Sequence, residues 1–190
     1  MFELLEHTAD IGVKGTGRDL NEAFAETAKG MFSILAEVKG IRLAEEKKLE
    51  VKAGNLEELL VEFLNELLYL FYTEKILFKE FEVKIVEGAG KKKAFEVKNH
   101  WSQTSGMNVV LDCYKSTTVT TGYKPVDLFE LKNGNKKEKK KFVLKCRAKG
   151  EVLDEKKHGL KGDVKAATYT GLKVGKQKNG KFFAQCILDV

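Results

Sequence analysis

Carboxylates stand among apolar residues at three widely separated places in this sequence. Asp10 lies in residues 6–12 (EHTADIG), and Asp189 lies in residues 187–190 (ILDV). A third stretch holds Glu151, then His158, then Asp163. A carboxylate in an apolar strand is costly unless a partner neutralises it, and hard divalent cations take oxygen ligands. These strand ends could therefore converge on one oxygen-rich site.

The same residues allow a simpler interpretation. Surface acids are common, and these carboxylates could form salt bridges with Lys165 or Arg147. His7 and His158 could be ligands or general bases, but a lone histidine is more often a structural residue that orients a carboxylate. The residues alone leave both interpretations open.

The elements that must position these acids follow from periodicity. Two amphipathic helices are expected, over 20–38 and 56–71, with capping boxes at Asp19/Glu22 and Asn55/Glu58, and with Gly40 ending the first. Alternation predicts strands at 2–5, 11–16, 47–51, 81–85, 142–148, 164–170 and 183–188, with a hairpin turn at Asn179-Gly180. Gly150-Glu151 is expected to end the strand at 142–148. Clustered strands and two helices predict an α+β fold.

Composition excludes several classes of protein. The 190 residues contain no apolar run long enough to span a membrane, and the acidic N-terminus predicts a cytoplasmic protein with no membrane partner. Cys113, Cys146 and Cys186 are isolated, so three buried, reduced thiols are expected. The sequence has neither a nucleophile motif nor a phosphate-binding loop. We therefore expect no nucleotide site in this chain.

The middle of the chain is basic. Residues 88–141 hold twelve lysines and five acids, a net charge of +7, whereas the whole chain carries +6. Glycine-rich and lysine-rich borders are typical of an insertion into a surface hairpin. We expect residues 88–140 to be a small β-rich inserted lobe, and residues 1–87 and 141–190 to form one discontinuous core domain. A lysine run alone is more often solvated surface, but lysines interleaved with Trp101, Tyr114 and Tyr123 suit contact with RNA.

Four motifs together resemble the archease family, the accessory proteins of the tRNA-splicing RNA ligase. They are HTADIG (7–12), GE followed by H (150–158), VKAxTY (164–169) and the closing ILDV. The motifs cover residues 1–87 and 141–190, which makes the central insertion atypical of the family. The resemblance implies two helices packed on a mixed or antiparallel sheet.

The resemblance also implies a function and a set of site residues. It implies a factor, not an enzyme, that promotes guanylylation and multiple turnover of the ligase, with GTP used by the ligase. The lysines of the insertion are then expected to contact RNA or a complex of RNA and ligase. It implies a Ca²⁺ or Mg²⁺ site at Asp10, Asp163, Asp189 and Val190. His7, Glu151, His158 and Lys165 match charged or polar motif positions and are expected on the functional surface. Thr170 stands where many relatives carry histidine, which places a required imidazole there in doubt.

Two other functions remain open. One is a stand-alone metal-dependent hydrolase, and the other is an RNA-binding chaperone of a tRNA-modifying enzyme. Product formation by the isolated protein favours the first, and RNA affinity without any effect on a ligase favours the second.

Overall fold

The computed structural model describes residues 1–6, 10–88 and 141–190. Their elements, in chain order, are β1 (Phe2–Glu6), β2 (Ile11–Gly17), α1 (Leu20–Leu35), β3 (Glu45–Ala53), α2 (Leu56–Glu74), β4 (Ile76–Gly88), β5 (Lys141–Val152), α3 (Glu155–His158), β6 (Ala166–Lys176) and β7 (Phe182–Asp189).

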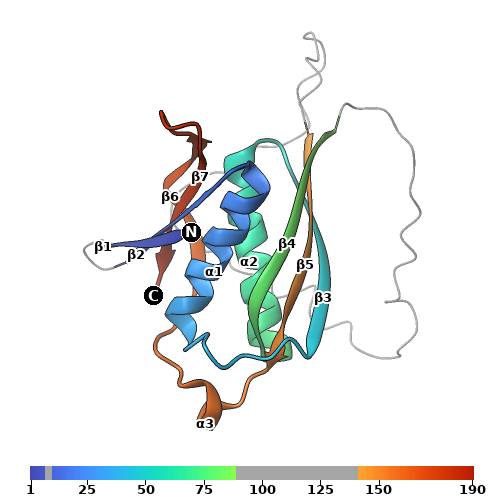
Figure 1. Cartoon of the computed structure of the whole chain (residues 1–190), viewed down its shortest axis with the longest axis vertical. Helices are drawn as coiled ribbons and strands as arrows, with labels where there is room; N and C mark the ends of the chain where they lie inside the picture. The colour runs from blue at the N-terminus through green and yellow to red at the C-terminus, as the bar shows by residue number, and fades with distance from the viewer. Residues whose placement is uncertain (7–9, 89–140) are drawn as a thin grey trace, which may run out of the picture. The chain divides into compact units, whose positions relative to one another are not determined.

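Within these residues the strands form two antiparallel sheets with helices α1 and α2 between them (Figure 1). The first sheet has the order β1-β2-β7-β6, and the second has the order β3-β5-β4. Helix α1 packs on β2 and β7 of the first sheet and on β4 of the second, and α2 packs on β6 and β3. The expected α+β class is confirmed, with two helices packed on antiparallel sheet.

Both expected helix starts are confirmed. Asp19 caps α1 by accepting a hydrogen bond from the Glu22 N–H (2.8 Å), and Asn55 caps α2 by accepting one from the Glu58 N–H (2.7 Å). In each case the glutamate turns back to the residue before the cap, because its carboxylate accepts from the N–H of Arg18 (2.7 Å) or Gly54 (2.9 Å). These contacts satisfy backbone donors that the first turn leaves unpaired.

The end of α1 was predicted wrongly. The helix ends at Leu35 rather than near Val38, because the next residues pair with the segment around His158. Ala36 forms an isolated antiparallel bridge with Leu160, and the Glu37 N–H donates to the His158 carbonyl (3.1 Å). A distant segment thus takes the backbone groups that a longer helix would have used.

Strand β5 also runs further than the sequence suggested. It continues through Gly150 to Val152, with Gly150 paired to Glu45 of β3 and to Phe78 of β4. A Cβ at Gly150 would overlap the Leu77 carbonyl oxygen, since β4 has a register shift between Phe78 and Glu80 and its backbone lies unusually close. The glycine therefore permits a close strand crossing instead of ending the strand.

The core between the sheets is built on aromatic contacts around Phe32 of α1. Its ring centroid lies 6.2 Å from that of Phe71 in α2 and 5.6 Å from that of Phe78 in β4. Cys146 and Cys186 are buried free thiols, as expected, and burial raises the pKa of each to about 12. Cys113 lies outside the described residues.

The first and last described residues around the basic middle of the chain are neighbours. Gly88, at the end of β4, pairs with Lys141 at the start of β5. The expected β-rich lobe at 88–140, with its aromatic residues, falls almost entirely outside the described residues, so that expectation stays a prediction.

Candidate functional site

Strand register places Asp10 and Asp189 at the same end of the first sheet. Ile11, the first residue of β2, pairs with Leu188 of β7. Asp10 precedes Ile11 and Asp189 follows Leu188, so the antiparallel pairing brings the two aspartates onto adjacent strands. Asp189 is exposed and Asp10 is half-buried. Residues from opposite ends of the chain therefore build one acidic sheet end.

Lys165 fixes the last two residues of the chain at this sheet end. Its backbone N–H donates to the Asp189 carbonyl oxygen (2.8 Å), and its ammonium Nζ donates to the Val190 oxygen (3.0 Å). Val190 is partly buried and packs against the core. Lys165 thus holds the end of β7 against β6 through both its backbone and its side chain.

Asp163 is held by a tyrosine of α2. The Tyr72 hydroxyl hydrogen-bonds to the Asp163 carboxylate and lies 3.0 Å from the Val164 carbonyl oxygen. Burial, together with the adjacent carboxylate, raises the pKa of Tyr72 to about 12. The phenol therefore keeps its proton at neutral pH and donates to the oxygens around it.

The donor types at this sheet end suit a hard cation. Carboxylate and backbone oxygens are the ligands that Mg²⁺ and Ca²⁺ prefer. Among the described residues, no three side chains of Asp, Glu, His or Cys lie close enough to hold a metal ion together. Asp163 is thus not gathered with Asp10 and Asp189 into a three-carboxylate cluster. The fit rests on the Asp10–Asp189 pair and nearby backbone oxygens.

Glu151 and His158 were expected on the functional surface, but the structure places both in the interior. Only 6% of Glu151 and 2% of His158 is exposed. The His158 Nε2 lies 3.0 Å from a Glu151 carboxylate oxygen, and the Asp154 N–H donates to Nδ1 (2.9 Å). Because Nδ1 accepts, the neutral ring carries its proton on Nε2 and donates it to Glu151. His158 therefore orients a carboxylate, which is the structural role considered for a lone histidine.

The Glu151 carboxylate joins three chain segments. It accepts hydrogen bonds from the Lys157 ammonium (2.6 Å), from the Arg42 N–H (2.8 Å) and from His158. These donors hold the pKa of Glu151 well below its usual range, and the hydrogen bond from Lys157 has the largest effect. The cluster ties the end of β5 and helix α3 to the loop after α1.

The remaining expected residues are placed as follows. His7 lies outside the described residues. Thr170 is exposed in a stretch where β6 and β7 change register between Thr168 and Lys173, next to Gly171 with φ +61°. A positive φ in this range favours glycine, so Gly171 allows the backbone conformation that the bulge requires.

Sequence reasoning missed the contacts that α2 makes with the start of β6. The Asn65 amide donates to the Ala167 carbonyl oxygen (3.2 Å) and accepts from the Ala167 N–H (2.8 Å). A polar Asn65 in the middle of a leucine-rich helix was the signal that could have revealed this pairing. Tyr72 gave no comparable signal, because it follows the apolar stripe of the helix directly.

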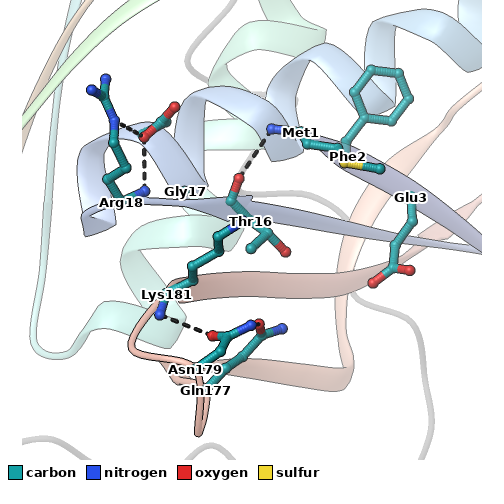
Figure 2. A pocket seen from close by; sticks show the side chains of 10 residues that line it. Met1, Phe2, Glu3, Thr16, Gly17, Arg18, Gln177, Asn179 and Lys181 are labelled. Carbon is teal, nitrogen blue, oxygen red and sulfur yellow. Dashed lines mark hydrogen bonds and ion pairs between the residues drawn. The ribbon is translucent and has the colours of Figure 1, made fainter.

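A pocket of about 380 Å³ lies at the opposite end of the first sheet (Figure 2). It is lined by the start of β1, the end of β2 and the β6–β7 hairpin. Three of its charged groups have partners, since the Arg18 Nε lies 2.9 Å from Glu22 and the Met1 ammonium donates to the Thr16 carbonyl oxygen (3.0 Å). None of the residues expected at the site lines it.

Among the described residues, no helix is both long enough and apolar enough to cross a membrane.

Comparisons with known proteins identify the family. The model of the archease protein family matches residues 2–119 and 114–190, so the match includes the middle of the chain, which the motifs did not cover. "Protein archease" of Pyrococcus abyssi is 31% identical over 189 residues, covering 100% of this chain and 98% of that protein.

Two further relatives bear on chain length and fold. "Protein archease" of Methanothermobacter thermautotrophicus is 40% identical over 86 residues, which are 62% of that protein but 45% of this chain, so this chain is the longer. The solution structure of protein 1598 of Methanobacterium thermoautotrophicum shares the fold with a TM-score of 0.64 and 24% identity, covering 100% of this chain and 98% of that one. From the full-length family match and the relatives, the chain belongs to the archease family.

Proposed function

We propose that this protein is an accessory factor of a tRNA-splicing RNA ligase that promotes guanylylation of the ligase and its multiple turnover. Family membership supports the proposal. The observation that carries it is the pairing of Asp10 and Asp189. Two carboxylates from opposite ends of the chain lie on adjacent strands at one accessible sheet end, with Lys165 securing the chain beside them.

The residues at this sheet end have distinct proposed roles. Asp10 and Asp189, with the Val190 oxygen, would hold a divalent cation, Mg²⁺ or Ca²⁺. When bound, that ion supplies positive charge that can bridge to oxygens of the ligase or its nucleotide. Lys165 is a positioning residue, because its two hydrogen bonds hold Asp189 and Val190 in place. Asp163 remains a proposed ligand whose carboxylate is shared with Tyr72.

The chemistry of ligation is assigned to the partner ligase. GTP is consumed there, since this sequence contains neither a phosphate-binding loop nor a nucleophile motif. A site of two carboxylates offers electrostatic stabilisation rather than a covalent step.

A ligation assay with RNA in excess over the ligase tests this function. Adding the protein is expected to raise the number of turnovers per ligase and the rate of ligase guanylylation, while the protein alone converts no RNA. Product formed by the isolated protein would instead indicate a hydrolase. RNA binding without any effect on the ligase would indicate an RNA chaperone.

Cation binding can be measured without the ligase. Titration calorimetry with Mg²⁺ and with Ca²⁺ should show binding to the wild-type protein that is lost in Asp10→Asn and Asp189→Asn. Glu46→Gln, on the outer face of the second sheet, is the matched control and should bind as the wild type does. Equal affinity in all four proteins would remove the cation from the proposal.

A further inference from the structure

Helix α2 lies along the open edge of the first sheet. In the order β1-β2-β7-β6, strand β6 pairs with β7 on one side only. On its other side, Asn65 pairs with the Ala167 backbone, and the Tyr72 hydroxyl bonds to the Val164 carbonyl oxygen. The Tyr169 hydroxyl lies 3.4 Å from the Glu62 carboxylate. We call this strip the α2–β6 seam; it comprises Glu62, Asn65, Glu66, Tyr69 and Tyr72 of α2 with Asp163, Val164, Ala167 and Tyr169.

Every tyrosine among the described residues lies on this seam. The sequence has five, and Tyr114 and Tyr123 fall outside the described residues. Positions 62, 65, 69 and 72 recur at helical spacing, which puts Tyr69 on the side of α2 that faces the edge of β6. Tyr69 is 52% exposed, Tyr72 37% and Tyr169 60%. Partly exposed tyrosines gathered on one strip are typical of the energetically dominant residues of protein interfaces.

The charge of the seam selects the kind of partner. Glu62, Glu66 and Asp163 are exposed carboxylates, and Asp189 lies next to Lys165 where the seam meets the acidic sheet end. Two cations flank these four carboxylates: Lys75, whose Nζ lies 5.9 Å from the Tyr72 ring centroid, and Lys165, whose Nζ bonds to Val190. An acidic surface repels the phosphates of RNA and attracts a basic protein surface.

We infer that the α2–β6 seam is a docking surface for a basic patch of the partner ligase, with Tyr69 and Tyr169 as its anchors. This inference rests on the proposed function. Tyrosine rings provide apolar contact area together with a polar hydroxyl, and they stack against arginine and lysine side chains. Because the seam is continuous with the acidic sheet end, docking there presents Asp10 and Asp189 to the same partner.

Binding of the full chain to the ligase, measured by biolayer interferometry, tests the inference. Tyr69→Ala and Tyr169→Ala are each expected to raise Kd about tenfold, and Glu66→Lys to raise it further by charge reversal. Tyr72 is left intact because it bonds Val164. Leu43→Ala is the control, since Leu43 is 46% exposed in the loop before β3 and should leave Kd unchanged. Circular dichroism and thermal melts confirm that each variant is folded.

The concentration dependence of ligase activation separates docking from the function itself. The two tyrosine variants should regain full activation at saturating concentration, whereas Asp10→Ala should not. Wild-type Kd and wild-type dose dependence in both tyrosine variants would overturn the docking surface while leaving the proposed function intact. Weaker ligase binding by these variants, without activation by the wild type, would support docking and contradict the function. Loss of RNA affinity instead of ligase affinity would overturn the docking surface.

Discussion

Glu151 is a motif residue whose carboxylate is buried and bonded within the fold. The carboxylate accepts from Lys157 and His158 of α3 and from Arg42 in the loop after α1. A buried carboxylate is tolerable only with such donors. The sequence pattern identified Glu151 and His158 as special, but it could not separate burial from exposure, because that depends on the loop after α1.

The low pKa of Glu151 predicts a specific loss of stability in acid. A carboxylate whose pKa is depressed in the folded state stabilises the protein fully above the unfolded value, which is ordinarily 4.5. This contribution declines as the pH falls from there towards the lower pKa of the folded state. Glu151→Gln should therefore lower the melting temperature at pH 7. The difference in melting temperature between the variant and the wild type should become smaller below about pH 4.5.

A matched variant provides the control for this acid effect. Glu46→Gln removes an exposed carboxylate that lies 3.8 Å from Lys48. Its melting temperature should equal that of the wild type at every pH. A pH-independent gap between Glu151→Gln and wild type would show that Glu151 is not charged in the folded protein.

At the scale of elements, local signals predicted where helices start but not where every element ends. The caps at Asp19 and Asn55 depend on residues three positions apart, so the sequence alone reveals them. The end of α1 depends on pairing with Leu160, and the continuation of β5 depends on the close approach of Leu77. The periodicity of a local segment carries no information about such distant partners. The pairing of Asp10 with Asp189 was nevertheless suggested by their matching apolar surroundings.

Gly150→Ala tests the close crossing of β4 and β5. The new Cβ would overlap the Leu77 carbonyl, a backbone atom that cannot turn away, so the variant should lose on the order of 3 kcal/mol of unfolding free energy. Urea denaturation measures this loss. Gly40→Ala is the control, because nothing lies within 4 Å of its Cβ, and its unfolding free energy should be within about 0.5 kcal/mol of wild type.

At the scale of the whole molecule, the chain separates an acidic sheet end from a basic middle. Residues 88–141 carry +7 of formal charge, so the remainder is close to neutral. Gly88 and Lys141 pair as neighbours across β4 and β5. We propose that the lysines of this segment contact RNA, or the complex of RNA and ligase.

Replacing residues 89–140 with Asn-Gly tests that proposal. Gly88 and Lys141 can be joined by a two-residue hairpin turn, so the shortened chain should fold. Its RNA affinity should be lower and less sensitive to salt than that of the full chain, because fewer phosphate contacts release fewer counterions. An unfolded product would contradict the domain boundary, and an unchanged salt slope would contradict the RNA contact.

The most direct measurement of the central claim is a double-mutant cycle on the rate of ligase guanylylation. Asp10 and Asp189 are proposed to act as one site, so removing either carboxylate should abolish most of the activation. Asp10→Ala, Asp189→Ala and the double variant should then show similar losses, since residues acting as a unit are not additive. Full activation by either single variant, or losses that multiply in the double variant, would contradict a shared site at the acidic sheet end.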